Sequence, residues 1–176
     1  MSEGAPYMTT RLTRDQVLEL CASRDAGEIA ELWLNNTDLS GLDLTECDLR
    51  GAHLREADLS AANLQKANFS QADLRMANLA LADLRNAHLY EASLPGADLS
   101  DANLTFAYLG RADLTGARLV GANLTMVDAR KANFSLADLS RANLREAKLN
   151  GANLDMAELT GAKLVGAIMP DGTKHE

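Results

Sequence analysis

The sequence has few aromatic residues and only two cysteines, and both shortages limit how it can build an interior. Phe, Trp and Tyr together make up 4% of its 176 residues. A core must therefore consist of small and branched aliphatic side chains. Cys21 and Cys47 are predicted to be buried thiols, the alternatives being a disulfide or a reactive nucleophile.

Long apolar segments are also missing from the chain. Residues 1–14 contain no apolar stretch of the kind found in secretory signals. No segment approaches the roughly 18 consecutive apolar residues that a membrane-spanning helix needs. We therefore expect a protein of the cytoplasm that makes no contact with a membrane.

Signatures of catalysis are absent as well. The sequence has no phosphate-binding loop, no dinucleotide-binding glycine pattern and no CxxC pair. His53 and His88 fall on different sides and turns of the architecture inferred below, and His175 lies near the end of the chain. We expect no enzyme, no cofactor and no metal site.

What the sequence has instead is a five-residue repeat that runs from Thr37 to Met169. Counting in steps of five from Leu39 gives 27 central positions, of which 25 are Leu or Phe; Ala129 and Met169 are the exceptions. Two residues before each centre, 23 of the 27 positions are Ala. This regularity predicts one repeat architecture for most of the chain.

A period of five residues excludes a single helix and a single flat strand. In an α-helix, five residues advance the side chain by about 500°, so successive leucines would spread around the cylinder. In a continuous strand, successive leucines would alternate between opposite faces. Ala and Leu two positions apart do point the same way on an extended segment. If the chain turns between units, every pair can face one interior, so the chain must coil around its own core.

The tandem motif A(D/N)LXX resembles the pentapeptide-repeat family, as in Ala57-Asp58-Leu59, Ala72-Asp73-Leu74 and Ala102-Asn103-Leu104. The resemblance covers about three quarters of the chain and extends to members that are abundant in cyanobacteria. It implies an all-β solenoid, a right-handed four-sided β-helix with four pentapeptide units in each coil. The 27 units then make about seven coils, stacked at the normal strand spacing of about 4.8 Å.

Three segments follow from this pattern: an N-terminal tail and helical cap (1–36), the β-helix (37–169) and a C-terminal tail (170–176). Thr13 and Gln16 form a capping-box pattern that predicts a short helix from Arg14 to about Arg24. A second short helix is expected from Asp25 to about Leu34. These helices are expected to cover the first coil, with Trp33 over its end. The C-terminal tail is expected to be frayed, and the protein is expected to be a monomer.

Polar residues dominate the outward positions of the repeat. The residue before each centre is Asp or Asn in 18 of 27 units, and folding at four units per coil stacks them into ladders that can hydrogen-bond along the axis. Residues 1–106 carry 17 acids and 8 bases, a net charge of −9. Residues 107–176 carry 8 acids and 9 bases, a net charge of +1. This distribution argues against nucleic-acid binding at the acidic end.

One side of the four-sided arrangement gathers exposed aromatic side chains next to basic ones. It is the side centred on Leu49, Phe69, Leu89, Leu109, Ala129, Leu149 and Met169. Such a mixture is typical of protein interfaces, and it could also bind single-stranded nucleic acid by stacking. The alternative is that these residues are merely tolerated on a convex surface. The candidate partner-binding residues are His88, Tyr90, Phe106, Tyr108, Arg111, Met126, Arg130 and Lys131.

Two functions from different classes are compatible with the sequence. The first is a non-enzymatic interaction or regulatory module that holds an unidentified protein or peptide on one face of a rod. The second, implied by the family resemblance, is a DNA mimic that acts on a type II topoisomerase such as gyrase. The acidic net charge and the rod favour this second function, whereas the near-neutral second half and the lack of a C-terminal dimer module oppose it.

Overall fold

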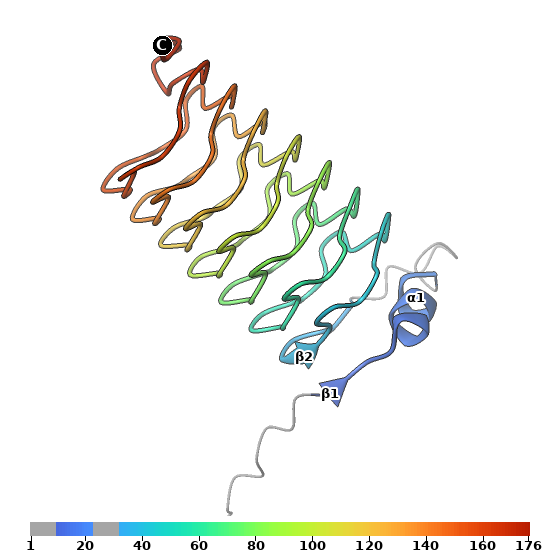
Figure 1. Cartoon of the computed structure of the whole chain (residues 1–176). Coiled ribbons are helices and arrows are strands. Elements are labelled where there is room, and N and C mark those ends of the chain that lie inside the picture. Colours follow the sequence, from blue (N-terminus) through green and yellow to red (C-terminus); the bar gives the residue numbers. More distant parts are fainter. Residues whose placement is uncertain (1–9, 23–31) are drawn as a thin grey trace, which may run out of the picture.

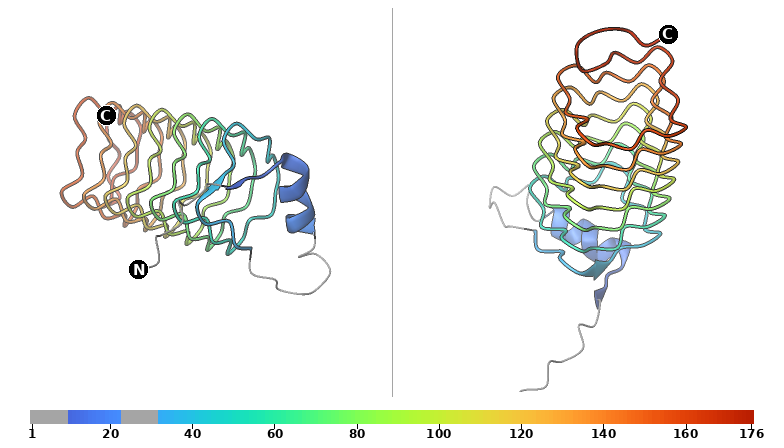
Figure 2. Two further views of the ribbon diagram at one scale, coloured as in Figure 1. Left: turned by 90° about the horizontal axis from the view of Figure 1, so that it is seen from below. Right: turned by 90° about the vertical axis from the view of Figure 1, so that its left-hand side faces the viewer.

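The computed structural model describes residues 10–22 and 32–176 (Figure 1). From Trp33 onward the chain winds into stacked turns in which residue i pairs in parallel with residue i+20, from Trp33–His53 to Lys148–Ile168. Four pentapeptide units therefore complete one turn. The two views in Figure 2 show the turns stacked along one axis, with α1 beside the first turns.

Each pentapeptide unit alternates between the interior and the surface. The central leucines from Leu34 to Leu149 and the alanines two residues before them are almost all fully buried, and the residues between them point outward. Backbone hydrogen bonds then join one turn to the next, as from Leu39 N to Asp58 O (2.7 Å). The core is thus a stack of leucine and alanine layers, as the repeat predicts.

The chain turns between units with a left-handed residue at every corner. All 27 corner positions from Asn36 to Gly166 have a positive φ, and 19 of them are not glycine. The residue after the corner donates its N–H to the central carbonyl, as from Leu42 N to Leu39 O (3.3 Å). A positive φ at the third residue of such a turn is the requirement of a type II turn.

The Asp and Asn residues before the centres stabilise these turns locally. In all 18 units that carry Asp or Asn, the side-chain oxygen accepts a hydrogen bond from the backbone N–H two residues later. The predicted axial bonds also occur, for example from Asn63 Nδ2 to Asp43 Oδ1 (3.2 Å) and from Asn78 Nδ2 to Asp58 Oδ1 (3.0 Å). The local bond is the more general role of these residues.

The N-terminal residues join the first turn more closely than the sequence indicates. Strand β1 (Thr10–Arg11) pairs in parallel with β2 (Thr37–Asp38). Thr10–Leu12 hydrogen-bond to the exposed backbone edge of the first turn, as from Leu12 N to Asp38 O (3.3 Å).

Helix α1 (Arg14–Ala22) begins at the predicted capping box. Thr13 N donates to Gln16 Oε1 (2.8 Å), and Gln16 N donates to Thr13 Oγ1 (3.3 Å). Val17 and Cys21 are buried in the same core as the leucines. The buried-thiol prediction is confirmed, and a side-chain hydrogen bond with Cys21 lowers the pKa of the Cys47 thiol.

Most of the predicted second helix, from Asp25, lies outside the described residues. At its described end, Leu32 and Leu34 are buried while Trp33 is 62% exposed, which is the alternation of an extended unit. The inward pattern therefore begins one unit before Thr37. The expectation that Trp33 covers the end is wrong, because its ring points outward and stacks on His53 at 3.9 Å.

The C-terminal residues form a hairpin, so the expectation of a frayed tail is wrong. Ile168 pairs with Lys174 in antiparallel orientation, and Gly166 N donates to His175 O (2.8 Å). The hairpin satisfies backbone groups that would otherwise be unpaired at this end. Leu154, Leu159 and Leu164 are only partly buried, unlike the leucines of earlier turns. Among the described residues, no helix is long and apolar enough to cross a membrane.

Candidate functional site

The eight candidate residues lie on or beside one side of the rod, which we call the tyrosine face. It is the outward side of the units centred on Leu49, Phe69, Leu89, Leu109, Ala129, Leu149 and Met169. Two columns of side chains run along it, one from the residues before the centres and one from the residues after them. Its two edges are the corner columns that hold Phe106 and Arg111.

In the first column, His88 stacks on Tyr108 with ring centroids 4.8 Å apart and an angle of 17° between the planes. The two residues are also bridged through their backbones. One full turn of the chain, four pentapeptide units, brings them together. Both side chains are exposed, and Tyr108 remains 47% exposed despite the stack.

The flanking corners carry side chains of opposite character. Phe106 and Met126 lie on one corner and are 49% and 39% exposed. Arg111 and Lys131 lie on the other corner, again on successive turns. Beside Tyr108 and Gly110, the tyrosine face therefore has an apolar edge at Phe106 and Met126 and a basic edge at Arg111 and Lys131.

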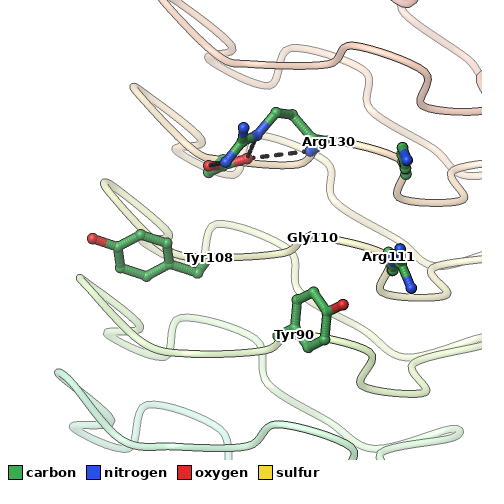
Figure 3. Close-up of a pocket in the computed structure, with 7 residues that line it drawn as sticks. Tyr90, Tyr108, Gly110, Arg111 and Arg130 are labelled. Atoms are coloured by element: carbon green, nitrogen blue, oxygen red, sulfur yellow. Dashed lines mark hydrogen bonds and ion pairs between the residues drawn. The ribbon is translucent and has the colours of Figure 1, made fainter.

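A hollow of about 280 Å³ lies on this face, against the basic edge (Figure 3). Its lining includes five of the eight candidates: Tyr90, Tyr108, Arg111, Arg130 and Lys131. His88, Phe106 and Met126 do not belong to it. The candidates thus divide into residues of the hollow and residues of the surrounding surface.

Gly110 creates the hollow, and sequence reasoning missed it. It occupies the second column, between Tyr90 on one neighbouring turn and Arg130 on the other. A Cβ atom at Gly110 would meet Cδ2 of Tyr90 at 3.3 Å. The signal was present in the sequence, because a glycine stands midway between Tyr90 and Arg130, four repeat units from each.

Arg130 is held in place by Asp128, which also lines the hollow and which sequence reasoning did not single out. The guanidinium donates from Nε to Oδ1 (2.8 Å) and from Nη2 to Oδ2 (2.6 Å). The hydrogen bonds from Arg130 lower the pKa of Asp128, and those to Asp128 raise the pKa of Arg130. This pair forms one wall with a defined orientation (Figure 3).

The basic edge is less fully neutralised. Arg111 reaches Glu91 at 3.3 Å, and its side chain is 55% exposed. Hydrogen bonds from Gln71, then from Tyr90 and Arg111, lower the pKa of Glu91. Lys131 forms no side-chain hydrogen bond or ion pair with any residue in 10–22 or 32–176. The lining therefore carries three cations against the single carboxylate of Asp128.

No metal centre is found in the described part of the chain, since no group of three or more His, Cys, Asp or Glu residues there could hold an ion. The hollow offers aromatic walls, basic groups and one paired carboxylate. Such an arrangement suits recognition of a partner group rather than bond making or breaking.

A sequence model of the family described as pentapeptide repeats matches residues 33–71, 62–101, 97–135 and 137–171. No curated protein matches the chain. Several solved structures do, and three of them illustrate the range of similarity.

A pentapeptide repeat protein, Rfr23, from the cyanobacterium Cyanothece 51142 is 41% identical over 49% of this chain, with a TM-score of 0.49. The match spans 58% of the length of that protein. HetL from the cyanobacterium Nostoc sp. strain PCC 7120, a protein involved in heterocyst differentiation regulation, is 30% identical over 93% of this chain and 100% of its own, with a TM-score of 0.24.

QnrB1, a plasmid-mediated fluoroquinolone resistance protein, is 17% identical over 92% of this chain and 83% of its own, with a TM-score of 0.57. At this identity the similarity concerns the fold alone.

Proposed function

The chain belongs to the pentapeptide-repeat family, and we propose that it is a non-enzymatic interaction module that holds a protein or peptide partner on its tyrosine face. One observation carries the proposal. Tyr90, Phe106 and Tyr108 are 44%, 49% and 47% exposed on adjacent turns, beside a basic edge. Exposed aromatic side chains next to arginine are the composition of binding hot spots.

The proposal includes a finer description of the fold: a right-handed four-sided β-helix with α1 as its N-terminal cap. Pentapeptide-repeat proteins form such β-helices, and the pairing of residue i with residue i+20 supports four sides here. The burial of Val17 in the same cluster as the first leucines supports the role of α1. An end that is covered in this way exposes less apolar surface to other chains.

The proposal includes no catalytic step. The interior is filled with leucine and alanine from Leu34 to Leu149, which leaves no enclosed space for a substrate. The lining of the hollow includes no serine, cysteine or histidine that could act as a nucleophile or as a general base near neutral pH.

The test compares two triple variants in cross-linking and pull-down from the source cell. One variant, Tyr90→Ala, Phe106→Ser and Tyr108→Ala, removes the aromatic groups of the tyrosine face. The matched control, Met76→Ser, Leu81→Ser and Leu136→Ser, removes exposed apolar groups from other corners. A partner of the tyrosine face is lost from the first variant and kept by the second. The purified partner must then bind wild type directly. Retained binding by the first, folded variant contradicts the proposal.

A DNA mimic that acts on a type II topoisomerase is the second candidate, and the net charge of −9 in residues 1–106 favours it. A polyanionic rod can occupy a surface that binds DNA. A supercoiling assay with purified gyrase decides the matter. If micromolar protein changes neither gyrase activity nor its poisoning by quinolones, this candidate is excluded.

A further inference from the structure

We propose that the hollow at Gly110 is a socket for one aromatic side chain of an extended, acidic peptide segment. The inference rests on the proposed function, because it concerns a partner held on the tyrosine face, and it adds the chemical character of the contacting segment.

The backbone conformation at position 110 does not require a glycine. The corner glycines, such as Gly116 (φ +63°), are favoured because their backbone is left-handed. Gly110 has no such conformation. Tyr90 and Arg130 occupy the same position on the neighbouring turns, so the β-helix accepts large side chains there. What the glycine supplies is therefore space, not backbone freedom.

The space beside Gly110 is large enough for an aromatic ring. A volume of about 280 Å³ exceeds the roughly 150 Å³ of an engineered cavity that binds benzene. The rings of Tyr90 and Tyr108 form two of its walls, and neither is buried. Aromatic rings pack favourably against other aromatic rings in offset or edge-to-face arrangements. One Phe, Tyr or Trp side chain fits both the size and the walls.

The hollow also has a positively charged edge. Arg130 is paired with Asp128, and Arg111 is paired with Glu91 at 3.3 Å. Lys131, together with the 55% exposed side chain of Arg111, supplies the positive charge that a partner can reach. In an extended segment, side chains two residues apart point the same way, so the residues two positions from an aromatic anchor face the rod about 6.6 Å along the chain. Asp or Glu at those positions can reach the basic edge. Residues 1–106 carry a net charge of −9, so an acidic segment is favoured at this edge over that part of the chain.

A peptide fits these observations better than a nucleic acid. A nucleic-acid strand would bring a continuous row of phosphates onto a protein whose first 106 residues carry a net charge of −9. A short segment with one aromatic and one or two acidic side chains needs only the hollow and its edge.

The experiment uses a library of random peptides displayed on phage, selected on the full wild-type chain. Each isolate is synthesised with a fluorescent label and titrated by anisotropy against wild type, Gly110→Val and Ala80→Val. Valine at position 110 fills the socket. Position 80 lies one residue after a centre on another side of the rod, so Ala80→Val is the matched control. Thermal melting checks that each variant is folded. If Gly110→Val does not fold, Gly110→Ala replaces it in the titrations.

The proposal expects isolates that share an aromatic residue with Asp or Glu two positions away. Their Kd should rise at least tenfold with Gly110→Val and stay unchanged with Ala80→Val. If Gly110→Ala is used instead, its smaller side chain should raise the Kd at least threefold. The double variant Arg111→Gln, Lys131→Gln should raise the Kd about tenfold at low salt and less at high salt. Replacing the aromatic residue of the peptide with Ala should abolish binding.

Several outcomes overturn the socket. They are isolates without the shared pattern, isolates that bind the folded Gly110 variants as tightly as wild type, and a short oligouridine that binds wild type more tightly than any isolate. A library that yields no isolate preferring wild type over these variants overturns it as well. If the triple variant of the tyrosine face loses its partner while Gly110→Val keeps it, the socket fails and the proposed function stands.

Discussion

Ala61 and Ala62 are neighbours in the chain, yet their environments impose opposite requirements. Ala61 is an exposed corner residue with φ +54°, whereas Ala62 points inward and is 1% exposed. A left-handed conformation costs an L-residue about 1–2 kcal/mol, and a buried methyl group contributes to the core. The same substitution at the two positions should therefore have opposite effects.

Ala61→Gly is expected to leave the free energy of unfolding unchanged or to raise it by up to about 1 kcal/mol. The relief of the left-handed backbone is partly offset by the added freedom of glycine in the unfolded chain. Ala62→Gly is expected to lower the free energy of unfolding by about 1 kcal/mol or more. Urea unfolding of both variants measures the difference, and equal effects would contradict the assignment of corner and interior.

Leu104→Ala removes a fully buried central side chain from the middle of the rod. The cost should be about 2–5 kcal/mol because the surrounding layers cannot close the cavity completely. Thr105→Ala is the neighbouring control. Its hydroxyl donates to Asn103 Oδ1 (2.6 Å), and the loss of that bond should cost only about 1 kcal/mol. Denaturant melts that gave the two variants equal costs would be incompatible with the inward leucine stack.

The acids that accept the local turn bonds should make stability depend on pH. Side-chain and backbone hydrogen bonds from Thr45 lower the pKa of Asp43, and those from Ser140 lower the pKa of Asp138. A lowered pKa in the folded state adds stability that is complete above the unfolded pKa of about 3.9 and is lost as pH falls through the folded pKa.

The double variant Asp43→Asn, Asp138→Asn tests this dependence, since Asn can accept the same backbone bonds, as it does at Asn103. The thermal midpoint of wild type should fall more steeply than that of the variant when pH is lowered below about 4. Near neutral pH the two should differ little. If the thermal midpoints of wild type and variant fell equally over the whole acid range, these two carboxylates would not contribute to the loss of stability in acid.

Helix α1 connects to the first turns through both packing and hydrogen bonding. Val17 is fully buried, and Arg14 Nε donates to Asp43 O (2.8 Å). By contrast, the leucines of the last turn stay partly buried beside the C-terminal hairpin. The two ends of the rod are therefore protected to different degrees.

Val17→Asp should detach α1, because it places a charge where the structure excludes water. Hydrogen exchange should then speed up at backbone amides of the first turn, such as Leu39 and Leu44, and remain slow near Leu104. Glu19→Ala is the control, because Glu19 is exposed on the same helix. It should leave the exchange rates at Leu39, at Leu44 and near Leu104 unchanged. Unaltered exchange in a folded Val17→Asp protein would exclude a protective role for α1.

At the scale of the whole molecule, stability depends on keeping both the five-residue phase and the register between successive turns. Each backbone bond to the next turn depends on this register, as from Leu64 N to Asp83 O (2.8 Å). Each repeat contacts mainly its neighbours, so a rod of this kind can lose a complete turn without losing its remaining contacts.

Deletion of residues 62–81 removes one whole turn of four pentapeptide units and should leave a folded, shorter rod with its tyrosine face intact. Deletion of residues 62–79 removes fewer residues but breaks the five-residue phase, so it should destabilise the protein much more. Circular dichroism and thermal melting compare the two. A shorter deletion that proved as stable as the longer one would contradict the control of stability by register.

Much of the interior could be predicted because the repeat is a local pattern. Ala and Leu two residues apart share a side of any extended segment, so the inward residues follow from the sequence. The helix at Arg14 followed from the reciprocal bonding pattern of Thr13 and Gln16, which also involves only near neighbours. The pairing of His88 with Tyr108 needed the further knowledge that a turn contains four pentapeptide units.

The amino-acid sequence by itself determined which side chains face inward, because that depends on positions a few residues apart. Only the tertiary structure decided that Trp33 stacks outward on His53, that the C-terminal residues fold back on Ile168, and that Gly110 opens a hollow. These features depend on side chains that meet across successive turns or at the ends of the rod. The space at Gly110 exists because Tyr90 lies on one side of it and Arg130, held by Asp128, lies on the other.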